Sequence, residues 1–123
     1  MNIQDGSPTA NAYLRFLQLA KALQKLPDAP NLDANEKALL EEIALRWFEK
    51  SPMTVREAIN LAHLGSPATL HKRITRLRQR DLLLTFNQPE DKRAKYLIPT
   101  EKTMAMFGHF GKNMSTVLAT SDA

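Results

Sequence analysis

The chain has 123 residues, which is enough for one domain with a modest core. Its formal charge of +4 is weak evidence for a polyanionic partner, because many soluble proteins carry a similar charge. Cysteine is absent, which excludes disulfides, thiolate metal ligands, cysteine nucleophiles and thiol redox sensing.

No apolar run approaches the length of a membrane-spanning helix, and the first residues lack the charged-then-apolar layout of a signal peptide. We therefore expect a soluble cytoplasmic protein without a membrane partner. The three histidines fall on three different expected elements, and no paired carboxylates, glycine-rich phosphate loop or catalytic triad is recognisable. The sequence therefore predicts no enzyme activity, no metal and no cofactor.

The N-terminal end is polar, and we expect residues 1–8 to be disordered and residues 9–119 to form one domain. Thr9 or Asn11 is suited to cap a first helix over Tyr13–Leu26. This helix is apolar around most of its circumference. One apolar face is enough for a small core, so the surplus predicts a second buried face against another chain.

A second helix is predicted from a capping signal. Asp33, followed three residues later by Glu36, resembles a capping box, and the helix then runs to about Lys50. Its apolar residues form two neighbouring rows, which predicts a broad face turned toward the core. The rows are Leu39, Ile43 and Trp47, and Leu40, Ala44 and Phe48.

Two short helices joined by a glycine turn come next. Met53–Thr54 is long enough for only one rung of a sheet, and its threonine suits the cap of a helix over Val55–Leu64. Gly65 closes this helix, and Ser66 followed by proline starts the next helix at once. This is the layout of a helix-turn-helix, whose second helix enters the DNA major groove.

The second of these helices, Ser66–Arg80, separates apolar from basic residues. Leu70, Ile74 and Leu77 form an apolar stripe, while the segment holds five lysines and arginines and no acidic residue. A helix with one buried stripe and one positive face fits a DNA major groove, and a basic face that is merely solvated is the alternative. The expected DNA-facing residues are Ser66, Ala68, Thr69, His71, Lys72, Thr75 and Arg76. Backbone contacts to DNA or ion pairs are expected of Arg73, Arg78 and Arg80.

A charged hairpin follows this helix. Leu82–Phe86 and Tyr96–Ile98 have strand character, and residues 87–95 between them are polar and highly charged. The basic residues of this tip have two interpretations: pairing with acidic neighbours in a solvated loop, or contact with DNA, with Arg93 in a narrow minor groove. These residues are Lys92, Arg93 and Lys95.

The last helix is predicted to open at Pro99–Glu101. Its apolar residues recur every three or four positions, which favours packing against another helix over the lining of a ligand pocket. The predicted homodimer forms through Tyr13–Leu26 and Met104–Leu118. The seam of the last helix consists of Met104, Phe107, Phe110, Met114, Val117 and Leu118.

Over roughly residues 32–107 the chain resembles the winged helix-turn-helix regulators of the multiple-antibiotic-resistance regulator (MarR) family. The order and spacing of several short motifs carry the similarity, since no single motif is specific. These motifs are Leu32–Glu36, Thr54 with Glu57–Ala58, Ser66–Lys72, Leu77–Leu83, Asp91–Arg93 and Leu97–Thr100.

The resemblance implies a homodimer that places its recognition helices in successive major grooves of a pseudo-palindromic site. It also implies that Asp91 braces the wing turn and that Arg93 reaches the minor groove. One departure is Asp81, which stands where the family commonly has a turn glycine. A small-molecule effector is compatible with the resemblance, and the residues do not require one.

Together these patterns predict an α+β fold, mainly α with a small β-hairpin: a winged helix-turn-helix with N- and C-terminal helices for dimerisation. The predicted function is a homodimeric, sequence-specific transcriptional regulator that binds double-stranded DNA through a recognition helix, residues 66–80, and a wing, residues 87–95. The alternative is a winged-helix protein-interaction module or accessory subunit without direct DNA reading. That alternative requires an exposed apolar patch on the helix-turn-helix.

Overall fold

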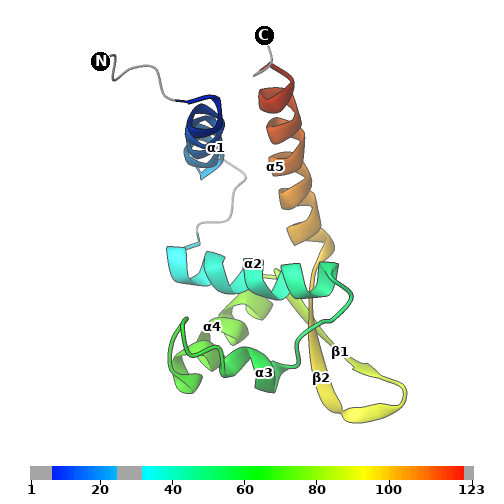
Figure 1. Cartoon of the computed structure of the whole chain (residues 1–123). Helices are drawn as coiled ribbons and strands as arrows, with labels where there is room; N and C mark the ends of the chain where they lie inside the picture. Colours follow the sequence, from blue (N-terminus) through cyan, green and yellow to red (C-terminus); the bar gives the residue numbers. More distant parts are fainter. Residues whose placement is uncertain (1–6, 25–31, 121–123) are drawn as a thin grey trace. The chain divides into compact units, whose positions relative to one another are not determined.

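The computed structural model describes residues 7–24 and 32–120, which belong to two compact units. One unit holds α1, Pro8–Gln24, and α5 from Ala105 onward; α5 as a whole spans Glu101–Thr120. The other unit, Asn31–Met104, contains α2 (Ala34–Phe48), α3 (Val55–Ile59), α4 (Pro67–Gln79), β1 (Leu83–Gln88) and β2 (Asp91–Pro99) (Figure 1). This element order confirms the predicted mainly α fold with a β-hairpin wing.

The first helix, α1, begins earlier than predicted. The Ala10 amide donates to Ser7 Oγ at 3.1 Å, so Ser7 caps the helix in place of Thr9 or Asn11. Pro8 then occupies the first helical position, where a missing amide hydrogen costs nothing. The predicted disorder of residues 1–6 and the predicted end of the first helix at residues 25–26 lie outside the described residues.

Both terminal helices expose apolar side chains. On α1, Tyr13 is 62% and Leu14 is 54% exposed, and on α5 Met104 is 40% exposed. Phe16, Leu17 and Met114 are exposed as well. The side chains of Val117 and Leu118, which complete the predicted seam, are outside the described set.

The core of the Asn31–Met104 unit lies where α4 and β2 contact α2 (Figure 1). Each fully buried leucine there contributes about 1.5–3 kcal/mol to the free energy of folding through removal of apolar surface from water. The residues with almost no exposed surface are Leu39, Leu40, Ile43, Met53, Ala58, Leu70, Leu77, Leu82, Leu83, Leu97 and Thr103.

The start of α2 agrees with the prediction, whereas its last turn does not. At the start, the Glu36 amide donates to Asp33 Oδ1 at 2.7 Å, as a capping residue requires, and this bond lowers the pKa of the Asp33 carboxyl. At the other end, Trp47 and Phe48 were expected in the core but are 38% and 67% exposed. The buried residues of α2 end at Ala44, so its last turn lies outside the core even though the helical periodicity continues through it.

The helix α3 is shorter than the predicted Val55–Leu64. Thr54 caps its start as predicted, and Glu57 completes a capping box that was not predicted here. The Glu57 amide donates to Thr54 Oγ1, and the Thr54 amide donates to Glu57 Oε1, both at 3.1 Å. It ends at Ile59 because the Asn60 side-chain amide donates to the Arg56 carbonyl at 2.8 Å and competes with the helical backbone.

The hairpin is antiparallel, from Leu83 opposite Pro99 to Phe86 opposite Tyr96. Met53–Thr54 adds the predicted single rung, since Thr54 pairs with Tyr96 and the Leu97 amide donates to the Met53 carbonyl at 2.8 Å. Both strands are longer than predicted. They leave only residues 89–90 as the turn, so most of the charged segment 87–95 is strand rather than loop. Within it Gln88 lies opposite Asp91, after a register irregularity between Phe86 and Gln88.

Two buried threonines join the base of the hairpin to the start of α5. Thr100 Oγ1 donates to the Asp81 carbonyl and Thr103 Oγ1 donates to the Leu82 carbonyl, each at 2.7 Å. Asp81 has a φ of 59°, the left-handed conformation that glycine adopts freely and that aspartate tolerates better than most residues. Asp81 therefore provides the left-handed residue of this turn without a glycine.

We expect Thr103→Val to lower the free energy of unfolding by about 1–2 kcal/mol, because it removes a buried hydroxyl that bridges the hairpin to α5. Chemical denaturation followed by circular dichroism measures the change. Ser115→Ala, which removes an exposed hydroxyl from the same helix, serves as the control and should stay within about 0.5 kcal/mol of the unaltered protein. Equal stability of the two variants would contradict the structural role of Thr103.

Candidate nucleic-acid interface

The helix α4 is built as a recognition helix requires. Ser66 caps it, accepting from the Thr69 amide at 3.3 Å, and proline occupies the first turn. Leu70, Ile74 and Leu77 are all buried, which confirms the predicted apolar stripe. Because one side of α4 is fixed against the core, the opposite side is held toward solvent.

The turn before α4 depends on Gly65. Its φ is +150°, a conformation that residues with a side chain rarely adopt. A Cβ at this position would lie 3.3 Å from Arg73 Nη1, which donates to the Leu64 carbonyl at 2.8 Å. Arg73 therefore acts inside the protein, where it closes the turn that directs α4.

The exposed face of α4 holds most of the predicted DNA-facing residues. Thr69 is half-buried, and Thr75 Oγ1 donates to the His71 carbonyl at 3.0 Å. The hydroxyl proton of Thr75 is thus used within the helix, and its oxygen remains an acceptor for a base-edge donor. The residues of the set that are exposed are Ser66, Ala68, His71, Lys72, Thr75 and Arg76.

One predicted DNA-facing residue also has a partner inside the protein. Arg76 Nη1 lies 3.6 Å from Glu36 Oε1, although 62% of the Arg76 side chain remains exposed. Arg80 Nη1 lies 3.7 Å from Glu36 Oε2. The ion-pair interpretation of Arg80 is therefore correct.

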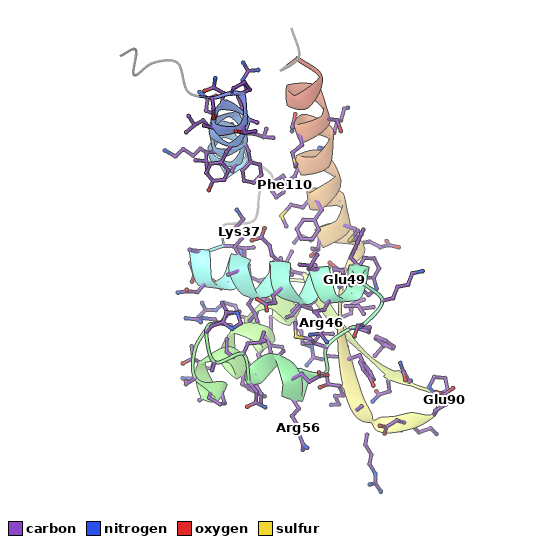
Figure 2. The ribbon with its side chains drawn as sticks, viewed as in Figure 1. Lys37, Arg46, Glu49, Arg56, Glu90 and Phe110 are labelled. Carbon is purple, nitrogen blue, oxygen red and sulfur yellow. The ribbon has the colours of Figure 1, made fainter. Side chains whose placement is uncertain are left out.

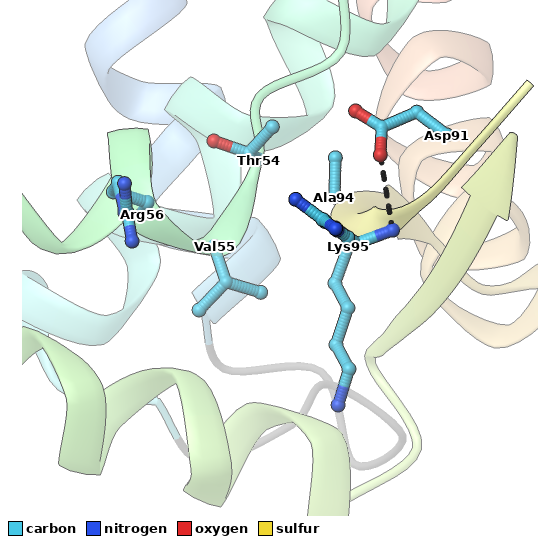
Figure 3. A pocket seen from close by; sticks show the side chains of 7 residues that line it. Thr54, Val55, Arg56, Asp91, Ala94 and Lys95 are labelled. Carbon is cyan, nitrogen blue, oxygen red and sulfur yellow. Dashed lines mark hydrogen bonds between the residues drawn. The ribbon is translucent and has the colours of Figure 1, made fainter.

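The wing is stiffened by side chains that bond to its own backbone. The Arg93 amide donates to Asp91 Oδ1 at 3.0 Å, so Asp91 braces the turn (Figure 3). Asn87 lies at an irregularity of the register, and its Nδ2 donates to the carbonyls of Lys92 at 2.9 Å and Ala94 at 2.7 Å. Lys92, Arg93 and Lys95 are all exposed on this braced strand.

A cleft of about 520 Å³ lies between the start of α3 and the wing (Figure 3). Arg56 of α3 lines it together with Arg93 and Lys95 of β2, and its side chain points away from α3 (Figure 2). Asp91 is the acidic residue on the same wall. The sequence did not single out Arg56, because only the folded hairpin brings β2 beside α3.

Solved structures of MarR-like regulators share this arrangement of elements. A MarR-like transcriptional regulator from Thermotoga maritima aligns with a TM-score of 0.65 at 17% identity, over 98% of this chain and 80% of its own. A second Thermotoga maritima transcriptional regulator aligns with a TM-score of 0.61 at 17% identity, over 91% and 72%. The chain has a MarR-like winged-helix fold.

A variant of Staphylococcus aureus MepR bound to an oligodeoxyribonucleotide has the same MarR-like fold. Its TM-score is 0.58 at 12% identity, over 94% of this chain and 84% of its own. No protein-family model matches the sequence, and no curated protein matches it significantly. At these identities the likeness establishes the fold alone.

Across residues 7–24 and 32–120, no group of three or more histidines and acidic residues is placed to hold a metal ion. Within the same residues, no helix is long and apolar enough to cross a membrane.

We expect Asn87→Ala to increase the amide hydrogen-exchange rates of residues 92–95, because it removes both side-chain bonds that hold β2 at the register irregularity. NMR-detected exchange measures this effect residue by residue. Gln88→Ala, a change of similar size on the same strand, is the control. Similar exchange rates in the two variants would show that Asn87 does not brace the wing.

Proposed function

We propose that this protein is a cytoplasmic DNA-binding transcriptional regulator and not an enzyme, and that α4 enters the major groove while the wing contacts the minor groove. The observation that carries the proposal is a fixed helix whose exposed face has basic and small residues, beside a braced hairpin with three exposed cations. Such a pair of elements suits groove recognition by a winged helix.

The exposed side chains of α4 offer the chemistry that base reading needs. Lys72 donates to guanine or phosphate oxygens, and His71 and Thr75 offer hydrogen-bonding atoms at the same face. Ala68 leaves room for a thymine methyl group or for close approach of the backbone. Ser66 and Thr69 at the helix start lie where phosphate contacts are usual.

The cations of the cleft between α3 and the wing support contact with the DNA backbone. Arg56, Arg93 and Lys95 line one opening, so a phosphate passing between the two elements would meet more than one positive charge. Arg93 is the residue we assign to the minor groove, because the Asp91 bond fixes the backbone from which it extends.

Apolar exposure argues against the alternative of a protein-interaction module acting through the helix-turn-helix. Among the described residues, the large apolar side chains that are exposed lie on α1, α2, β1 and α5. On α3 and α4 the described apolar residues are instead buried or half-buried, apart from alanine. The surface of the helix-turn-helix is therefore suited to a polar, charged partner.

DNA binding predicts a steep salt dependence that the basic residues determine. We expect Lys72→Ala and Arg93→Ala each to reduce the slope of log K against log salt concentration by about 1. Fluorescence anisotropy with duplexes selected from a random DNA pool measures the slopes. Lys37→Ala, a matched loss of charge on α2 pointing away from α4 (Figure 2), should leave the slope unchanged. Absence of salt-sensitive binding by the unaltered chain would contradict the proposal.

Dimerisation is a separate part of the proposal, with a second copy of the chain as the partner. Tyr13, Leu14 and Phe16 are exposed on α1. Together they expose more apolar surface than the single apolar residues that are normal on the surface of a monomer. We expect light scattering at micromolar concentration to give twice the chain mass, and Phe16→Glu to lower it toward the monomer. Leu45→Glu, at an exposed leucine of α2, is the control. A monomeric mass for the unaltered chain would contradict the dimer.

A further inference from the structure

A carboxylate of α2 is buried against two arginines of the recognition helix. Glu36 is 4% exposed, yet its oxygens lie 3.6 Å and 3.7 Å from the Nη1 atoms of Arg76 and Arg80. Both distances are longer than an N–H···O hydrogen bond, and Glu36 Oε2 is buried without a hydrogen-bond partner among the described residues. The carboxylate therefore lies within reach of the charges of the two guanidinium groups, and it also interacts with the side chain of Asp33.

This arrangement is not the one that best stabilises the start of α2. In a full capping box, Glu36 would return to the amide of Asp33, and it would stay close to water. Burial of an ionised carboxylate costs several kcal/mol, and its attraction to a partner offsets this cost only with excellent geometry. The position of Glu36 between α2 and α4 therefore points to a role other than stability.

The two arginines differ in exposure in a way that indicates this role. The side chain of Arg76 is 62% exposed, whereas that of Arg80 is 33% exposed. Arg76 thus has one Nη beside the buried carboxylate, while most of its side chain remains exposed. A free arginine reaches the nearest phosphate whatever the sequence, whereas an arginine held at one end has a fixed direction.

We propose that Glu36 is a positioning residue that fixes the direction of Arg76 and withdraws part of its charge from the DNA backbone. Glu36 thereby raises the preference for a specific sequence over random DNA. This inference rests on the proposed DNA-binding function and names the residue that sets its selectivity. Glu36 lies on α2, outside α4 and the wing, which are the two elements proposed to contact the grooves.

The test compares Glu36→Gln, which keeps the shape and removes the charge, with the unaltered chain. Anisotropy is measured with a duplex selected from a random pool and with an unrelated duplex of the same length. We expect several-fold tighter binding to the unrelated duplex, a salt slope steeper by about 1, and a smaller ratio between the two affinities. Glu41→Gln removes an exposed charge from the same helix and corrects for net charge alone.

Two further variants test whether Glu36 acts through Arg76. Arg76→Ala in the Glu36→Gln background should remove the gain in binding to the unrelated duplex. Arg76→Ala alone leaves the buried Glu36 carboxylate with one fewer partner, so circular dichroism first confirms that this variant is folded under the assay conditions. In the folded variant the salt slope should fall less than for Lys72→Ala, and binding to the selected duplex should weaken. If Glu36→Gln matched Glu41→Gln, or if Arg76→Ala alone acted like Lys72→Ala, the positioning role would be overturned. Failure of the unaltered chain to bind any duplex would instead overturn the proposed function.

Discussion

The burial of one side of α4 is the constraint on which the rest of the winged-helix unit depends. Leu70 and Leu77 have no exposed surface, and α4 contacts α2, α3 and β1. If this stripe were not buried, the opposite face would not be held in one direction. The capping serine and the Gly65 turn then determine where the helix begins, and the Arg73 bond to the Leu64 carbonyl closes that turn.

The wing is fixed by a different kind of interaction, since its tip has little apolar surface. At its base, Thr100 and Thr103 use buried hydroxyls to join the hairpin to α5. Toward its tip, Asn87 and Asp91 bond to the backbone of the wing itself. These hydrogen bonds hold the backbone of the wing in place where no apolar core does so. The three exposed cations therefore extend from a fixed strand. A rigid scaffold that presents charged side chains in this way reduces the entropy lost on binding DNA.

Local signals in the sequence predicted much of this fold. Caps at Asp33, Thr54 and Ser66 each appear in the structure, because a capping bond involves residues only three positions apart. The apolar stripe of α4 was predicted for a similar reason, since helical periodicity is a local property. The resemblance to MarR-family regulators added the order of elements, and the solved structures confirm that order.

The features that the sequence did not reveal depend on distant parts of the chain. Periodicity placed Trp47 on the core face of α2, but it contains no information on how far α4 and β2 extend along that helix. The pair of Glu36 and Arg76 joins residues forty positions apart, and the cleft brings Arg56 beside a hairpin that follows it by a similar distance. The wing was expected to be a loop because polar residues dominate it, although strand pairing there uses the backbone.

The most direct test of the account is a map of the residues that contact DNA. Amide NMR shifts of the isotope-labelled chain, measured while a duplex selected from a random pool is added, give this map without any substitution. We expect the largest shifts on residues 66–79, which form α4 and its cap, on residues 87–95 of the wing, and on Arg56. Shifts confined to the exposed apolar end of α2, around Leu45 and Phe48, or an unchanged spectrum, would contradict it.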